Sequence, residues 1–321
     1  MITLGIDTSN YASSIAVIDF TNKTVLLNKK KFLTVATGER GLRQQDAVFN
    51  HIKNLTEILE LVGSEIDFNC IQAVGVSIKP TEEENSYMPC FLVGRMAATA
   101  IAASLQVPLI TASHQLGHLN SALFYLNNPN YYCEQVIMFH VSGGTTDMLL
   151  VSHGKVAKKI GTSMDLFAGQ AIDRLGVKLG YSFPAGEYVS KLAKACTEEL
   201  SKTPKISIKG MDCNLSGLEN QCDKLLSEGK DSGYVAKYCL HFIADTLIAM
   251  AQKSRKEYGD IPIIFAGGVM SSEVIKEIIT VEMTDVHFVP PIFSQDNGIG
   301  VAAIAAKERI SQDIYDKKSK V

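Results

Sequence analysis

The order of predicted strands and helices runs twice through this chain, and this repeat constrains the fold more than any other feature. In each half, three strands form a meander that is followed by helix, strand, helix and strand. In the first half the segments are strands at 2–6, 15–18 and 24–32, a helix at 39–61, a strand at 71–78, a helix at 92–105 and a strand at 107–111. The pattern predicts an α/β fold in which each half builds one mixed sheet covered by helices.

The second half follows an Asn-Asn-Pro-Asn stretch that predicts a loop at 127–130. Its segments are strands at 136–141, 146–151 and 155–160, helices at 167–179, 187–195 and 234–257, a strand at 262–266, a helix at 272–279 and a strand at 286–289. A last helix is predicted at 298–310, and the stretch 196–216 has no strong period.

Two domains of ordinary size fit a chain of 321 residues. We expect one domain over residues 1–112, completed by a returning C-terminal helix at 298–321. The second domain is expected over residues 113–297 and to carry the metal and nucleotide site. Two such domains facing each other leave a cleft between them, which is the usual place for a ligand.

The composition predicts a cytoplasmic protein without a membrane segment. No apolar stretch approaches the roughly 20 residues that span a bilayer. The seven cysteines are scattered and form no C-x-x-C motif, which favours reduced thiols. The formal charge of −3 gives no basic surface for the whole molecule, so nucleic-acid binding would need a local patch or a partner.

Three glycine-containing turns follow predicted strands. The first, Gly5–Ser9, joins the two strands of the opening hairpin, with its turn at Asp7, Ser9 and Asn10. The others are Val141-Ser142-Gly143-Gly144 and Gly267-Gly268, and glycines there let backbone N–H groups approach an anion closely. Each is also an ordinary tight connection when no ligand is present. Their occurrence at similar places in both halves favours a nucleotide site.

A carboxylate on a predicted helix, Asp173, could accept hydrogen bonds from ribose hydroxyls. The alternative is an exposed helix carboxylate beside Arg174. The residue types alone leave both interpretations open.

Two imidazoles, His114 and His118, stand at positions i and i+4 of a predicted helix and so share one face. This spacing suits two ligands of one metal, although such pairs also arise by chance. Gln115 occupies the place of the general-base Glu in the peptidase H-E-x-x-H motif. Asp296 precedes the last helix, where an Asp is commonly an N-cap. Two imidazoles and a carboxylate would leave coordination sites open, as in catalytic Fe²⁺ or Zn²⁺ centres.

Taken together, these motifs resemble the TsaD/Gcp family of tRNA threonylcarbamoyladenosine transferases, formerly described as O-sialoglycoprotein endopeptidases of the M22 type. The resemblance runs nearly end to end. The matching segments are His51, Val93–Ile110, His114–His118, Val141–Gly144, Gly169–Asp173, Phe183–Gly186, Leu215–Leu218, Gly267–Val269 and Pro290–Asn297.

The resemblance implies two domains of the actin/hexokinase/Hsp70 (RNase H-like) fold. It implies one divalent metal, Fe²⁺ or Zn²⁺, held by His114, His118 and Asp296. It also implies an adenine nucleotide: ATP, AMP or a carbamoyl-adenylate. The residues expected to contact the nucleotide or substrate are Val141, Ser142, Gly143, Gly144, Asp173, Gly186, Gly267, Gly268 and Ser272.

Several positions depart from the family pattern and indicate a divergent paralogue. The family's G-P-G-L loop is replaced by the acidic segment Lys79–Ser86, and the family Asn after G-G-V is Ser272. Ser113 and Leu116 replace the Asn and Glu of N-H-x-E-G-H, and Thr145 replaces the His of S-G-G-H-T. Because these changes leave the predicted metal and nucleotide residues in place, they bear on the acceptor.

The expected function is therefore an acyltransferase that moves a threonylcarbamoyl or carbamoyl group from an adenylate to an amine. The family's acceptor is N6 of adenosine next to the tRNA anticodon. The expected partners are tRNA, a TsaB-like paralogue of the same fold and an ATPase subunit, with a homo-oligomer as a further option. The alternatives are a carbamoyltransferase with another acceptor, a non-catalytic nucleotide-binding subunit and, least favoured, a metallopeptidase.

Overall fold

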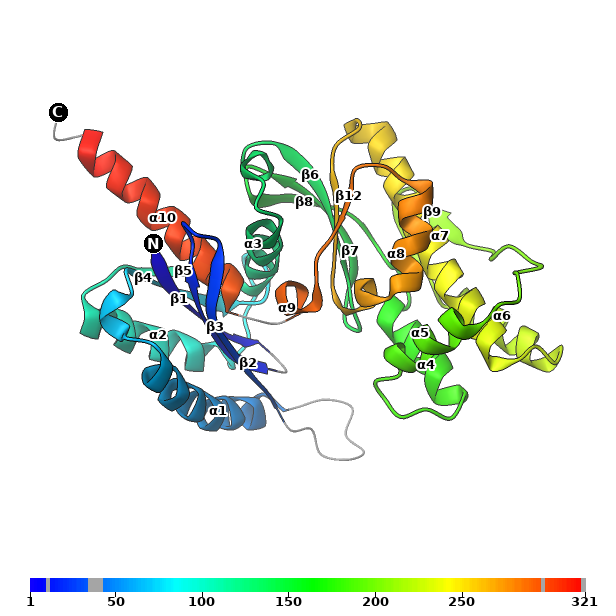
Figure 1. The fold of residues 1–321 in the computed structure, drawn as a ribbon, viewed down its shortest axis with the longest axis horizontal. Helices are drawn as coiled ribbons and strands as arrows, with labels where there is room; N and C mark the ends of the chain where they lie inside the picture. Colours follow the sequence, from blue (N-terminus) through cyan, green and yellow to red (C-terminus); the bar gives the residue numbers. More distant parts are fainter. Residues whose placement is uncertain (10–11, 34–42, 296–297, 319–321) are drawn as a thin grey trace. The chain divides into compact units, whose positions relative to one another are not determined.

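The computed structural model describes residues 1–9, 12–33, 43–295 and 298–318. These residues belong to two compact units (Figure 1). Unit 1 comprises Met1–Pro129 and Ile292–Val321, and unit 2 comprises Asn130–Pro291. Each unit contains a five-stranded mixed sheet. The α/β fold with two mixed sheets, predicted from the repeated pattern, is confirmed. Within the described ranges, no helix is both long and apolar enough to cross a membrane.

The sheet of unit 1 has the strand order β3-β2-β1-β4-β5. Its antiparallel strands are β1 (Ile2–Ser9), β2 (Ala12–Asp19) and β3 (Thr24–Phe32), while β4 (Ala73–Lys79) and β5 (Leu109–Ser113) continue it in parallel. The predicted turn was wrong at Asp7 and Ser9, because β1 stays paired with β2 until Ser9 faces Ala12, while Asn10, its third residue, lies outside the described residues. Two of the polar side chains in this part of β1 have buried partners: the Thr8 hydroxyl donates to the Cys90 carbonyl at 3.1 Å, and Asp7 accepts from the Ser77 hydroxyl.

Helices cover both faces of this sheet (Figure 1). One face carries α1 (Gln44–Glu65) and α2 (Phe91–Leu105), and the short helix η1 (Phe68–Cys70) follows α1. The other face carries α3 (His114–Leu126) and α10 (Ile299–Lys318). Alternation along β1 divides the two cores: Leu4 and Ile6 pack toward α1 and α2, whereas Thr3 donates to the Ala302 carbonyl of α10 at 2.9 Å.

Glycines bring α10 into backbone contact with the sheet and with α3. A Cβ atom on Gly5 would lie 2.0 Å from the Gly298 carbonyl oxygen, and one on Gly75 would lie 2.0 Å from that of Val301. At Gly300 a Cβ atom would lie 1.7 Å from the carbonyl oxygen of Gly117 in α3. No side chain fits in these contacts, so the glycines set how closely α10 and α3 approach.

The division between the units falls after α3, while the boundary expected from the sequence was residue 112. Helix α3 packs on α10 and on the end of the first sheet, and this contact keeps residues 114–126 with unit 1. His114 and His118 therefore belong to unit 1. The cleft expected between the two domains stays a prediction.

The sheet of unit 2 has the order β12-β11-β6-β7-β8, which repeats the topology of unit 1. The antiparallel strands are β6 (Gln135–Val141), β7 (Thr146–Ser152) and β8 (Lys155–Thr162), and the parallel ones are β11 (Ile263–Ala266) and β12 (Val286–Phe288). Helix η2 (Pro129–Tyr132) precedes β6.

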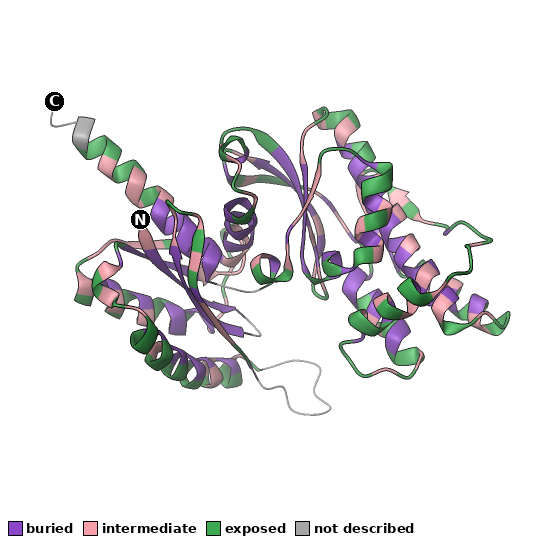
Figure 2. Ribbon diagram, viewed as in Figure 1, coloured by how far each residue is buried: buried purple, intermediate pink, exposed green. Residues whose placement is uncertain are grey.

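The helices of unit 2 pack around α7 (Ser232–Tyr258), whose buried side is visible in Figure 2. The other helices are α4 (Ala168–Lys178), α5 (Gly186–Ala195), α6 (Gly217–Ser227), η3 (Gly268–Ser271) and α8 (Glu273–Glu282). The short helix α9 (Pro291–Ser294) begins at the last residue of unit 2 and otherwise belongs to unit 1. The pattern missed α6 and the small hairpin of β9 (Ser207–Lys209) and β10 (Asp212–Asn214), which lies in the stretch without period.

Two helical glycines provide a test of the α10 contact. Gly63→Ala, on the exposed side of α1, has its nearest neighbour at 3.8 Å. It should stabilise unit 1 by about 0.5–1 kcal/mol through helix propensity. Gly300→Ala should instead destabilise it by about 1–3 kcal/mol or more, because a methyl group would overlap the Gly117 carbonyl. Urea unfolding of both variants measures the difference, and equal effects would contradict the close packing.

Candidate functional site

The two histidines lie in the first turns of α3. The helix begins after Ser113, whose side-chain oxygen accepts from Leu116 N at 3.1 Å. This N-cap orients the first turn, in which His114 is partly exposed and His118 is buried. The Nε2 atoms of the two rings lie 2.9 Å apart. The structure therefore brings the predicted pair together by their outer nitrogens.

The opposite side of the His114 ring faces a carboxylate of β1. Asp7 Oδ1 lies 3.0 Å from His114 Nδ1, and the same oxygen accepts from the Ser77 hydroxyl of β4. Asp7 Oδ2 accepts from Ser9 N at 3.4 Å. Asp7 is almost completely buried, with 1% of its surface exposed. The Asp7 carboxylate in the sheet thus contacts Nδ1 of the His114 ring, while Nε2 of the same ring contacts His118.

The donor set fits a divalent metal. The 2.9 Å separation is that of a direct N–H···N hydrogen bond between the rings. Two nitrogens that each lie about 2.05 Å from one ion are about 2.9 Å apart at the 90° angle of an octahedral site and about 3.3 Å apart in a tetrahedral zinc site. Among the residues that the structure describes, no three His, Cys, Asp or Glu side chains converge on one point. Asp7 does not complete the set, because it contacts Nδ1 of His114, whereas the histidine pair meets through the Nε2 atoms. The third predicted ligand, Asp296, lies outside the described residues.

The acidic segment Lys79–Ser86 lies against the N-terminus of α3. Glu82 Oε1 accepts from Ser113 N at 3.1 Å, and the Pro80 carbonyl accepts from Gln115 N at 3.0 Å. Lys79 forms an ion pair with Glu82 at 3.7 Å. Glu83 and Glu84 are exposed. The segment is thus attached on both sides of His114 and presents carboxylates next to the histidine pair.

The second group of predicted residues forms a turn in unit 2, between β6 and β7. Ser142 N donates to the Thr145 carbonyl at 2.8 Å, and Ser142 Oγ accepts from Gly144 N at 3.2 Å and Thr145 N at 3.1 Å. The turn is thus closed by its own serine. Within 4 Å of a Cβ built on Gly143 or Gly144 there is no other described atom, so this side of the turn is open.

Two further glycines pack against this turn. Gly169 N, at the start of α4, donates to the Ser142 carbonyl at 3.1 Å, and a Cβ atom on Gly169 would lie 2.7 Å from Gly143. Gly267 has φ = +108°, and a Cβ atom there would lie 2.2 Å from the Val141 carbonyl oxygen. The structure therefore brings Val141–Gly144 and Gly267–Gly268 together, as a surface of bare backbone.

Asp173 and Gly186 are also neighbours. Asp173 Oδ1 accepts from Ala185 N, at the beginning of α5, at a distance of 2.7 Å. Burial raises the pKa of Asp173 above its ordinary value, against the opposing effect of the Ala185 and Gly186 N–H groups. One oxygen of the proposed ribose acceptor is therefore engaged with the α5 N-terminus.

Ser272, another predicted contact, is mostly buried at the start of α8. Its Oγ accepts from Ser190 Oγ of α5 at 2.8 Å. In this arrangement the hydroxyl joins two helices as an acceptor, and the bond does not use its own O–H.

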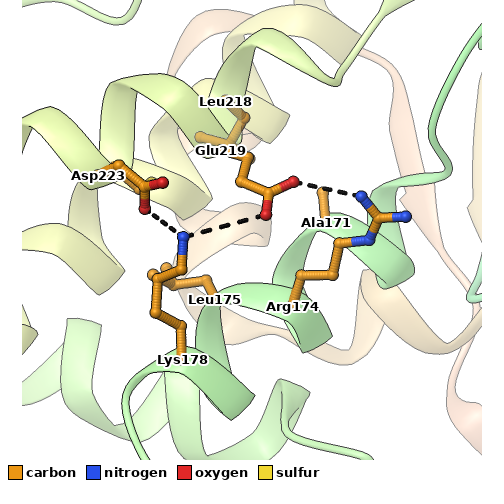
Figure 3. A pocket seen from close by; sticks show the side chains of 8 residues that line it. Ala171, Arg174, Leu175, Lys178, Leu218, Glu219 and Asp223 are labelled. Carbon is orange, nitrogen blue, oxygen red and sulfur yellow. Dashed lines mark hydrogen bonds and ion pairs between the residues drawn. The ribbon is translucent and has the colours of Figure 1, made fainter.

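A hollow beside α4 was not predicted (Figure 3). Ion pairs between α4 and α6 cross it: Arg174 to Glu219 at 3.2 Å, and Lys178 to both Glu219 and Asp223. Its lining residues are Ala171, Arg174, Leu175, Lys178, Leu218, Glu219, Cys222 and Asp223. Arg174 thus pairs with Glu219 of α6. The Asp173 carboxylate is half-buried and accepts from Ala185 N, so the alternative of an exposed carboxylate beside Arg174 does not describe it.

The sequence interpretation placed Asp7 in one of the three glycine-containing turns without connecting it to His114, and it gave no site role to Ser77 or Gly169. Asp7 was assigned to a turn, and nothing in its spacing connects it to a histidine 107 residues away. The only sequence signal is the Gly-Ile-Asp-Thr-Ser segment itself. Ser77 follows four β-strand residues of ordinary type and carries no signal at all.

Another histidine lies beneath the same strands. His51 of α1 is fully buried, and its Nδ1 lies 2.7 Å from Ser13 Oγ of β2. Its Nε2 has no hydrogen-bond partner among the described residues. Burial lowers the pKa of His51 to about 4, although the Asp7 carboxylate acts in the opposite direction. His51 therefore serves the packing of α1 as a neutral side chain.

The sequence of this chain matches one family of known proteins. A family model described as TsaD, tRNA N6-adenosine threonylcarbamoyltransferase, matches residues 28–303. A relative of that name from Streptococcus suis (strain 05ZYH33) is 28% identical over 325 aligned residues, which cover 97% of this chain and 93% of the relative.

Solved structures resemble the fold. A ROK family glucokinase from Streptomyces griseus, in complex with glucose and AMPPNP, has a TM-score of 0.56 at 11% identity, covering 96% of this chain and 100% of that one. Full-length HypF, in a phosphate- and nucleotide-bound form, has a TM-score of 0.60 at 13% identity, covering 95% of this chain and 55% of that one. These likenesses confirm the predicted fold of the actin/hexokinase/Hsp70 type.

His51 gives this region a pH dependence. Its pKa in the folded state, about 4, lies below the ordinary value of 6.5, so the unfolded chain binds the proton more readily between these values. The free energy of unfolding should therefore fall as the pH is lowered from about 6.5 toward 4, by up to about 3 kcal/mol. His51→Gln should flatten this part of the profile. His153→Asn, in the β7–β8 turn, is the control, and urea titrations at several pH values measure both.

Proposed function

Since this chain belongs to the TsaD family of tRNA N6-adenosine threonylcarbamoyltransferases, we propose that it transfers a threonylcarbamoyl group from an adenylate to N6 of the adenosine next to the tRNA anticodon, with one bound divalent metal. The observation that carries the proposal for this chain is the convergence of His114 Nε2 and His118 Nε2 at 2.9 Å. A transferase that had lost its activity would be under no constraint to keep this pair aligned.

The transfer replaces one acyl bond by another. The N6 amine attacks the carbamoyl carbon of the adenylate, the bond from this carbon to the phosphate oxygen breaks, and AMP leaves while the amine gives up a proton. The step needs no covalent intermediate on the protein. Cys90 and Cys213 agree with this, because burial raises the pKa of each thiol to about 11, away from the range of a nucleophilic thiolate.

In this proposal the metal is held by His114, His118 and Asp296. The supporting observations are the distance between the imidazole nitrogens and the buried carboxylate behind His114. A bound Fe²⁺ or Zn²⁺ would polarise a carbonyl or hold the carboxylate of the threonyl group as a Lewis acid. The protein would contribute two imidazole nitrogens from one helix turn.

The nucleotide is proposed to bind at the open side of the β6–β7 turn. Ser142, Gly143 and Gly144 would approach the phosphate through backbone and hydroxyl groups, because glycine leaves the backbone accessible. Val141, Gly267 and Gly268 would form the adjoining bare surface, with Asp173, Gly186 and Ser272 beside it. Gly144 N and Thr145 N now bond to Ser142 Oγ, so an anion would have to share or displace that contact.

The net charge of the chain and the exposed apolar face of α2 support a partner protein in the proposed reaction. A net charge of −3 leaves most phosphate contacts of a tRNA to a second protein. Helix α2 has Arg95 as its only charged residue, yet Leu92 is 50% and Met96 is 62% exposed. Phe49 of the adjacent α1 is 63% exposed. Such a surface is typical of a protein interface, and we propose that a TsaB-like subunit covers it, with an ATPase subunit joining the complex.

A second candidate function keeps the donor and changes the acceptor. Glu83 and Glu84 would repel a polyanion at the segment that is attached to both sides of His114. A small thiol or hydroxyl compound would not be repelled in this way. The two functions differ in acceptor alone, so one assay separates them.

Metal content and transfer should be lost together in His118→Ala. Purified wild-type protein should contain close to one equivalent of Fe or Zn by elemental analysis. Given threonylcarbamoyl-adenylate, partner proteins and unmodified tRNA, it should form modified adenosine, detected by nucleoside mass spectrometry. His118→Ala should lower both quantities at least tenfold.

His153→Asn, a histidine replacement remote from α3, is the control and should change neither. Equal metal in His118→Ala and wild type would disprove the ligand set. Absence of modified adenosine, with turnover of the adenylate when small thiols or hydroxyl compounds are supplied, would favour the second function.

The nucleotide site is tested at Gly144. Because no described atom lies within 4 Å of a Cβ at this position, Gly144→Val should fold normally yet block the approach of phosphate. AMP or ATP binding should weaken at least tenfold, about 1.4 kcal/mol, in calorimetry. Gly217→Val, at the start of α6 with its nearest neighbour at 3.9 Å, should bind as the wild type does. Unchanged affinity in Gly144→Val would move the nucleotide elsewhere.

A further inference from the structure

The hydrogen bonds around Asp7 determine which nitrogen of His114 carries a proton. Asp7 Oδ1 faces His114 Nδ1 at 3.0 Å and accepts from the Ser77 hydroxyl, while Asp7 Oδ2 accepts from Ser9 N. An ionised carboxylate can only accept, and the groups around it supply donors. The hydrogen of a neutral His114 ring therefore belongs on Nδ1, and the lone pair belongs on Nε2, toward His118.

The carboxylate is also held in place by the sheet. Asp7 pairs with Ser14 across β1 and β2, and Ser77 is anchored in the neighbouring β4. Both side chains are buried, with exposures of 1% and 0%. The central strands of unit 1 thus fix the orientation of a ring that α3 alone would leave free to rotate about its χ angles.

We infer that Asp7 is a positioning residue: through Nδ1 it fixes the tautomer and direction of His114 so that Nε2 is ready to bind the metal, and Ser77 holds Asp7 for this task. The inference rests on the proposed metal site. It extends that site from two helix residues to β1 and β4. Hydrogen-bonded carboxylates behind ligating histidines commonly change metal affinity by about 10–100-fold.

Zn²⁺ affinity tests the inference without any assay of activity. Competition with a chromophoric chelator gives the dissociation constant for wild type, Asp7→Asn and Ser77→Ala. We expect about 10–100-fold weaker binding in Asp7→Asn and a smaller loss, about threefold to tenfold, in Ser77→Ala. Thr3→Val is the matched control, because it removes another buried hydrogen bond from the same face of β1, at 2.9 Å to Ala302 O, without touching His114. Its affinity should stay within about twofold of wild type.

Imidazole ¹⁵N spectra of the metal-free protein give an independent reading. In wild type the His114 ring should show the protonated Nδ1 and unprotonated Nε2 pattern, and Asp7→Asn should mix the two tautomers. This result does not depend on metal. If Asp7→Asn fails to fold, as judged by circular dichroism, Ser77→Ala carries both measurements.

The outcomes separate the inference from the proposed function. Wild type that binds no Zn²⁺ would disprove the metal site, while the ¹⁵N pattern would still decide the role of Asp7. Wild type that binds Zn²⁺ with Asp7→Asn and Ser77→Ala both equal to it would overturn the inference and leave the metal site standing. Equal losses in Thr3→Val and Asp7→Asn would reduce the effect to general loosening of unit 1 and would also overturn it.

Discussion

Backbone contact between α10 and its neighbours is the constraint on which the arrangement of unit 1 depends. Glycines at both sides let the helix approach β1, β4 and α3 with no side chain between them. Close approach fixes α3 relative to the sheet, and α3 carries both histidines. The short distance between Asp7 of β1 and His114 of α3 is possible because β1, β4 and β5 run parallel, so the end of β1 and the start of α3, directly after β5, lie at the same edge of the sheet.

The two units repeat a topology and use it for different chemistry. At the end of β1, unit 1 places a buried carboxylate, with serines and an imidazole around it. At the equivalent end of β6, unit 2 places a serine and two glycines in a turn that is open on one side. A carboxylate and imidazoles suit a cation, whereas bare backbone suits an anion. One strand arrangement therefore carries a carboxylate and imidazoles in unit 1 and bare backbone in unit 2.

The surface around the histidine pair differs in charge from what a tRNA would require. Glu82 is attached to the N-terminus of α3 through Ser113 N, and the next two residues extend this acidic segment into solvent. The exposed apolar side chains of α1 and α2 lie elsewhere in unit 1, on the outer side of the helix layer.

The sequence by itself determined the two α/β halves, most helices and strands, and the pairing of His114 with His118, because each depends on local period or on i, i+4 spacing. From their glycine motifs, the sequence also assigned Val141–Gly144 and Gly267–Gly268 to one predicted nucleotide site. It failed at the end of β1, where Ser77, far along the chain, donates to Asp7, and pairing with β2 keeps both Asp7 and Ser9 extended.

Only the tertiary structure decided the rest. It showed that α3 belongs to unit 1 and that Asp173 accepts a hydrogen bond from the N-terminus of α5. It also placed Asp7 beside His114, which lies 107 residues further along the chain. Hydrogen bonds between distant segments have no sequence period, since they arise where packing happens to place a donor beside an acceptor. For that reason the close pair of histidines could be predicted from the sequence, and the carboxylate beside it could not.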